Sequence, residues 1–204
     1  MTHREPYYQD DLPREEVDNY WQYQYAQTAQ MPILWYDRAS SLKLSADIIY
    51  FECNMEATAC NIEAMHSERT LALIPVYMML AGYALECLLK GIYLNFGSLI
   101  ESEGKLKSWW KSNGHNLNAI ADKINNDANR EVVRLNEKEQ FLLDRLNVYI
   151  LWAGRYPIPT EYKAKMPVKF QNGSAAPLYM VTNKDKERID EVFERLISVK
   201  NKHL

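Results

Sequence analysis

The chain has 204 residues, of which 47% are hydrophobic and 25% are charged. This composition is typical of one globular domain and excludes extensive disorder. The net charge of −3 excludes a general electrostatic attraction to nucleic acid, so any contact with RNA or DNA has to come from a local patch.

The cysteines point to a reduced protein without a bound metal. Three are present, in apolar surroundings, and none has the spacing of a zinc site: Cys53, Cys60 and Cys87. Phosphate-loop and dinucleotide motifs are absent, so we expect no cofactor. The acidic N-terminal residues lack the apolar core of a secretory signal, and we expect a cytoplasmic protein.

The spacing of apolar residues predicts an all-α fold. Only 7 glycines occur, and apolar positions recur three and four residues apart, which predicts an up-and-down helical bundle of four or five main helices. Residues 1–31 are expected to form an N-terminal extension, helical from Pro13 to Ala29, and residues 32–204 the bundle. In the extension we expect a mostly aromatic stripe to pack against the protein: Val17, Tyr20, Trp21 and Tyr25.

Two long helices should follow as an antiparallel hairpin. The first runs from Pro32 and directs Ala46, Ile49 and Phe51 inward, and the second runs from residues 68–70 to Phe96, with the turn near residues 66–67. Residues 71–85 are uncharged but shorter than the ~20 residues that span a bilayer, and two charged residues follow at 86 and 90. We therefore expect a core helix and no membrane.

The C-terminal half predicts shorter helices and one long loop. Asn116 should begin a helix, and Asn136 with Glu139 has the spacing of a capping box. The helix after Asn136 should end before Gly154. Residues 157–181 then contain four prolines and predict a long loop, and a last helix over 184–199 could be capped by residue 182 or 183.

Glu86 and Lys90 are the first candidate site residues. They lie one helical turn apart in an apolar run, with the glutamate first, which favours an ion pair. Burying ions costs several kcal/mol each unless they are paired. Two interpretations stay open: a structural salt bridge, or a pair that orients another polar residue.

Two later segments could meet that pair. His115, in Gly114-His115-Asn116-Leu117, precedes a helix and can act as an acid or base, or serve only in capping. Arg155 and Tyr156 come where a helix gives way to the loop. Arg155 can hold a phosphate or carboxylate, or only complement the helix dipole, and Tyr156 can stack or donate a hydrogen bond.

These motifs, in this order, resemble those of the prokaryotic HEPN-like helical proteins. The resemblance covers about residues 70–157 and rests on Leu85-Glu86-Cys87-Leu88-Leu89-Lys90-Gly91, Gly114-His115-Asn116-Leu117, Tyr149 and Gly154-Arg155-Tyr156-Pro157. It implies a helical bundle, frequent homodimers, and in many members metal-independent RNA cleavage or a role in toxin-antitoxin and phage-defence systems. In active members an arginine precedes a histidine by four to six intervening residues.

This chain departs from that arginine-to-histidine pattern. No arginine stands at that spacing before His66 or His115, and seven residues separate Arg195 from His203. The departure favours a binding or scaffold module in a stress, defence or toxin-antitoxin setting, with an RNA or protein partner at the loop. The alternative is an RNA-cleaving protein in which His115 is the acid or base and Arg155 holds the phosphate. Binding of a small anion by Arg155 and Lys90 also stays open.

Overall fold

The computed structural model describes residues 13–59, 68–96, 98–169, 175–182 and 184–202, and it confirms the all-α fold. Its α-helices are α1 (Arg14–Ala29), α2 (Pro32–Ala59), α3 (Glu68–Asn95), α4 (Ser108–Asn113), α5 (Leu117–Asp127), α6 (Glu137–Val148) and α7 (Asp185–Asn201). A π-helical turn, η2 (Tyr149–Ala153), continues α6, and a 3₁₀ turn, η3 (Tyr162–Lys165), lies in the loop. The turn expected near residues 66–67 lies outside the described residues.

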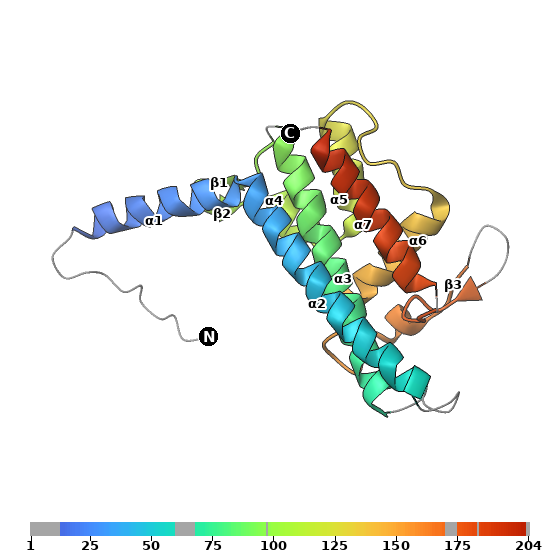
Figure 1. The fold of residues 1–204 in the computed structure, drawn as a ribbon. Coiled ribbons are helices and arrows are strands. Elements are labelled where there is room, and N and C mark those ends of the chain that lie inside the picture. The colour runs from blue at the N-terminus through green and yellow to red at the C-terminus, as the bar shows by residue number, and fades with distance from the viewer. Residues whose placement is uncertain (1–12, 60–67, 97, 170–174, 183, 203–204) are drawn as a thin grey trace.

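Helix α3 is the centre of the bundle. It runs antiparallel to α2 along the length of both helices, and it also contacts α5, α6, η2 and α7 (Figure 1). Pro75 lies in its second turn. By length and composition alone, residues 72–95 could cross a membrane, and half of that stretch is buried inside the structure.

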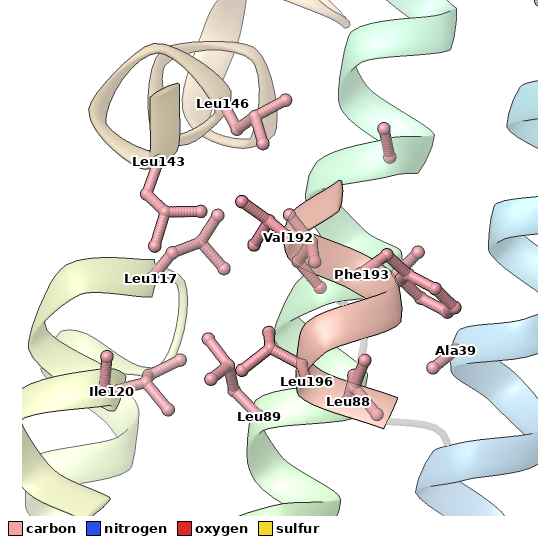
Figure 2. Close-up of a cluster of buried hydrophobic side chains, with 14 of the residues drawn as sticks. Ala39, Leu88, Leu89, Leu117, Ile120, Leu143, Leu146, Val192, Phe193 and Leu196 are labelled. Carbon is pink, nitrogen blue, oxygen red and sulfur yellow. The ribbon is translucent and has the colours of Figure 1, made fainter. Parts of the chain in front are cut away.

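The core is formed where four helices meet α3. Leu88 and Leu89 of α3 lie among side chains from α5, α6 and α7, and α2 closes the cluster with Ala39 (Figure 2). Leu88, Leu89 and Ala39 are completely buried. The apolar face predicted for the helix after Asn116 is also buried, at Leu117, Ile120, Ala121 and Ile124. Burial of each leucine or isoleucine side chain contributes about 1.5–3 kcal/mol.

Both predicted helix starts have side-chain caps. The Asn116 side chain accepts a hydrogen bond from the Ala119 amide at 3.1 Å. Asn136 and Glu139 form the reciprocal capping box, each side chain accepting from the other's backbone N–H. The prediction for α7 was wrong at residue 182: the Thr182 hydroxyl donates to Asp185 and does not cap the helix. Residue 183 lies outside the described residues.

Helix α7 is fixed to the bundle by charged residues. Arg145 of α6, which is 2% exposed, pairs with Asp185, which is 1% exposed. The guanidinium also donates to the Met180 carbonyl, so the end of the proline-bearing loop is held against α6. On the other side of α7, two lysines and two aspartates of α2 and α7 pair alternately: Lys43, Asp47, Lys186 and Asp190.

Two packing predictions were wrong. Phe51, expected in the interior, is 62% exposed on α2. In α1 only Val17 is buried, and Tyr20, Trp21 and Tyr25 are exposed. The physical reason is the direction of α1, which leads away from the bundle (Figure 1) and leaves the outer side of α2 without a neighbouring helix from this end of the chain.

The structure adds small elements that the sequence pattern did not indicate. The polar stretch after residue 97 contains the β1 (Glu101–Ser102) and β2 (Lys105–Leu106) hairpin and then α4. Glu103 and Gly104 both have positive φ, as a two-residue type I′ turn requires. A second hairpin in the loop pairs β3 (Val168–Lys169) with β4 (Ala175–Ala176).

Candidate functional site

The carboxylate of Glu86 is the buried centre of the candidate site. It lies on the inner side of α3, with its residue 5% exposed. One oxygen accepts a hydrogen bond from Lys90 Nζ at 2.6 Å, one helical turn later. Both interpretations of this pair are compatible with the geometry, because the ion pair forms and the second carboxylate oxygen contacts another residue.

That other residue is His115. Its Nδ1 lies 2.9 Å from Glu86 Oε2, and its side chain is 59% exposed. In the neutral tautomer that donates Nδ1–H to this carboxylate, Nε2 is free to accept a hydrogen bond. The imidazole and the ring of Tyr83 on α3 form a T-shaped pair, with ring centroids 6.3 Å apart. His115 is therefore a solvent-facing imidazole held by a buried carboxylate.

The Lys90 ammonium is enclosed by aromatic rings. It lies 5.3 Å from the centroid of Trp35 on α2 and 5.8 Å from that of Trp110 on α4. The side chain of Lys90 is 12% exposed. Cation–π contacts of this kind stabilise a partly desolvated cation. This arrangement uses the charge of Lys90 inside the protein rather than at a surface where a ligand could bind it.

The backbone around His115 is positioned by a buried amide. Asn147 of α6 accepts a hydrogen bond from the Leu117 amide at 2.9 Å through Oδ1. Its Nδ2 donates to Asn116 Oδ1 at 3.4 Å. The start of α5, and with it His115, is therefore held by α6 as well as by α3.

Arg155 and Tyr156 lie outside this cluster. The Arg155 guanidinium donates to the Leu151 carbonyl at 2.7 Å and stands 5.4 Å from the Tyr156 ring centroid. Both residues are exposed. Among the described residues, the structure brings Glu86, Lys90 and His115 together, and it does not bring Arg155 or Tyr156 into contact with them.

Cys87 shows how strongly the setting of the site disfavours added negative charge. Burial first, and then the Glu86 carboxylate, raise the pKa of the Cys87 thiol to about 11, although Lys90 and Arg38 act in the opposite direction. The thiol is free and stays protonated at neutral pH. It is therefore a poor nucleophile in this position.

A second polar surface lies after the candidate cluster, on residues 155–169. The segment contains one carboxylate, Glu161, and four cations: Arg155, Lys163, Lys165 and Lys169. Its net charge is therefore +3, whereas the net charge of the whole chain is −3. Every residue in it except Pro159 is exposed. Lys163, Lys165 and Lys169 have no ion-pair partner in the part of the chain that the structure describes. We call this segment the basic loop.

Exposed aromatic rings accompany the cations of the basic loop. Tyr156 is 57% and Tyr162 is 75% exposed. In the 3₁₀ turn η3, side chains three residues apart lie on one edge, so Tyr162 and Lys165 share a side. The run of lysines and tyrosines between prolines is visible in the sequence. The spacing of these residues did not show that their side chains are exposed.

Several residues around the candidate site lie outside the segments from which the site was predicted. Trp35, Trp110 and Tyr83 surround the Glu86 cluster, and only their aromatic character marks them in the sequence. Arg145 and Asn147 were also missed, although both interrupt the apolar pattern of α6 and are buried. A charged or amide side chain within an apolar helical stripe is the signal that could have found them.

The described residues contain no group of three or more His, Cys, Asp or Glu side chains that could hold a metal ion. The expected absence of a metal and of a cofactor stays a prediction. Comparison of the chain with known protein families, with curated proteins and with solved structures finds no match.

Proposed function

We propose that this protein is a non-catalytic, HEPN-like binding module, acting in the cytoplasm in a prokaryotic stress, defence or toxin-antitoxin setting. The observation that carries the proposal is the contrast between its two polar sites. The charges of Glu86 and Lys90 satisfy each other inside the bundle, whereas the cations of the basic loop are exposed and unpaired among described residues.

Single-stranded RNA is the partner that best fits the basic loop. Lysines supply phosphate contacts, and exposed tyrosines supply flat faces on which unpaired bases stack, at about 1–3 kcal/mol per base. Tyr162 and Lys165 share one edge of η3, so a base and an adjoining phosphate can be held from the same side. Arg155 next to Tyr156 repeats this combination at the start of the segment.

Fluorescence anisotropy with a labelled single-stranded RNA tests this proposal. Replacing Lys163, Lys165 and Lys169 together with alanine should weaken binding, and should reduce the slope of log affinity against log salt by about 2, at ~0.7 per phosphate contact. The control replaces three other exposed lysines with alanine, Lys105, Lys107 and Lys111, and so changes the net charge by the same amount. These lysines lie on or beside β2 and α4, away from β3 (Figure 1).

The Tyr162→Ala variant separates stacking from charge. It should weaken RNA binding about tenfold while leaving the salt slope unchanged. Equal losses in the loop variant and the control variant would contradict a site at the basic loop. If the protein bound anionic vesicles and did not bind RNA, the partner of the basic loop would be a membrane surface and not RNA.

RNA cleavage is a second candidate, favoured by the geometry of His115. In the tautomer that donates Nδ1–H to the buried carboxylate, Nε2 of this exposed imidazole is free to take a proton. General acid or base catalysis of this kind contributes ~100-fold or more. Arg155 contacts its own segment and does not complete this site, so the phosphate would need another cation.

Incubation of RNA with the purified protein in EDTA tests the second candidate. Cleavage that is lost in His115→Ala and kept in His66→Ala would support it and overturn the non-catalytic proposal. Intact RNA, or equal cleavage by both variants, would eliminate His115 as a catalytic residue.

A further inference from the structure

The described residues of α1 and of the outer side of α2 form an extensive exposed apolar surface. Large apolar side chains on these two helices and their junction are 41–63% exposed: Tyr20, Trp21, Tyr23, Tyr25, Met31, Ile33, Leu34, Leu44, Ile48 and Phe51. At about 150–250 Å² for a whole aromatic side chain, their exposed area is on the order of 1,000 Å². The largest contiguous apolar patch on a typical monomer is about 300–600 Å² and often has a function, so two neighbouring apolar surfaces with this total area point to a partner.

The surface has two separate parts. The arm is α1, whose aromatic residues 20–25 are exposed. The stripe is the face of α2 that carries Ile33, Leu44, Ile48 and Phe51, the last three spaced by four and three residues on one side of the helix. At about 1.5 Å per residue, the 16-residue arm is ~24 Å long, and the stripe from Ile33 to Phe51 spans ~27 Å.

The arm cannot cover the stripe of its own chain. The two helices meet at a corner over Gln30 and Met31, and the arm points away from the bundle (Figure 1). The corner is held by Trp35, whose indole N–H donates to the Ala29 carbonyl at 3.2 Å, and by Gln30, which donates to Glu101 at 3.1 Å. The arm is therefore held outward, and an isolated helix of this length is marginally stable in water.

We infer that a second copy of this chain covers the stripe, with the arm of each copy lying on α2 of the other. Arm and stripe have similar lengths, each carries exposed aromatic or aliphatic side chains, and the corner directs the arm away from its own stripe. A twofold dimer buries two such contacts, and the exposed side-chain area of arm and stripe together, on the order of 800 Å² per copy, is close to the ~800 Å² per partner of a standard interface. This inference does not depend on the proposed function of the basic loop.

Light scattering on the full chain, over a range of concentrations, tests the dimer. The expected mass is twice 23.9 kDa. Trp21→Glu in the arm and Phe51→Glu in the stripe should each weaken the dimer at least ~30-fold, as loss of a central aromatic residue does. Leu151→Glu is the matched control, since Leu151 is 54% exposed on η2 and should leave the dimer intact.

Mixing the two variants tests the exchange of arms. A Trp21→Glu copy keeps an intact stripe, and a Phe51→Glu copy keeps an intact arm, so the mixture should form heterodimers through one complete contact while each variant alone is monomeric. If the dimer instead packed arm on arm or stripe on stripe, the mixture would form no heterodimers. That result would overturn the exchange of arms. A monomeric parent chain, or dimers that survive both substitutions, would overturn the inference, and a monomer would leave these surfaces to residues 1–12 or to a different protein.

Discussion

Glu86 holds His115 at 2.9 Å while its other oxygen pairs with Lys90, so one buried carboxylate joins the centre of α3 to the start of α5. Glu86→Ala leaves the Lys90 ammonium without its partner in a nearly closed aromatic setting. We expect a loss of about 3–5 kcal/mol in the free energy of unfolding, the range for one broken buried pair. Urea unfolding followed by circular dichroism measures it.

The control for this substitution is Glu131→Ala. Glu131 forms an exposed ion pair with Arg134, three residues later, and such pairs contribute about 0–1 kcal/mol. A cost for Glu86→Ala no greater than that of Glu131→Ala would show that the carboxylate does not organise the site.

His115→Ala should cost less than Glu86→Ala. The imidazole is 59% exposed, so its removal opens the Glu86 oxygen to water instead of leaving it dry and unsatisfied. We expect a loss of about 1 kcal/mol, the contribution of an ordinary hydrogen bond. Urea unfolding of both variants measures the difference, and a cost equal to that of Glu86→Ala would place His115 among the structural residues of the bundle.

Asp185 should make stability fall in acid. Burial alone would raise the pKa of its carboxyl, but hydrogen bonds from Arg145 and Thr182 outweigh burial and lower it. Because the folded pKa is below the unfolded one, which is about 3.9, this stabilisation is present above that value and is lost as pH falls below it.

The Asp185→Asn variant checks the assignment to this residue. It should be less stable than the parent at pH 7, and its stability should change less between about pH 4 and pH 2. Thermal unfolding across that interval measures both effects. Parallel pH profiles for the two proteins would assign the acid sensitivity to other carboxyl groups.

The sequence was sufficient for the helices that carry a local signal. The capping box at Asn136 and Glu139, the cap at Asn116 and the apolar face of α5 all depend on residues within one or two turns of one another. Such features are encoded by spacing alone. The contact of Glu86 with His115 was only a candidate, because it joins residues 29 positions apart and depends on how α5 meets α3.

The spacing of apolar residues could not show which helix faces are covered by another part of the protein. Trp21 and Phe51 have the same apolar character as Leu88, and only the corner at Gln30 and the position of α1 decide that they are exposed. Arg155 follows the same rule: its place at a helix end was evident, but its side chain turns back to Leu151. A periodic pattern identifies a face of a helix and does not identify what covers it.

Cys87 should react slowly with alkylating reagents in the native protein. With its pKa raised to about 11 by burial, about one thiol in a thousand is ionised at pH 8. Iodoacetamide labelling followed by mass spectrometry of a Cys53→Ser, Cys60→Ser variant measures this residue alone. The rate in urea should rise to that of an ordinary thiol, and rapid labelling without urea would contradict the burial of Cys87.

Gly91 should resist replacement by alanine although alanine is the better helix former. A Cβ atom at this position of α3 would lie closer to the Tyr36 ring of α2 than van der Waals contact allows. Helix propensity favours alanine by about 1 kcal/mol, but overpacking a tight contact costs about 1–3 kcal/mol. We therefore expect Gly91→Ala to be destabilising by up to about 2 kcal/mol.

A double-mutant cycle with Tyr36→Ala isolates the reason for the Gly91 effect. Tyr36→Ala alone should be destabilising, because the ring is 3% exposed and its loss leaves a cavity. Once the ring is absent, the methyl group that Gly91→Ala adds meets no obstacle and the helix propensity of alanine remains, so this substitution should become neutral or stabilising. Urea unfolding of the four proteins measures the coupling, and additive effects would show that Tyr36 is not the residue that requires glycine at this crossing of α2 and α3.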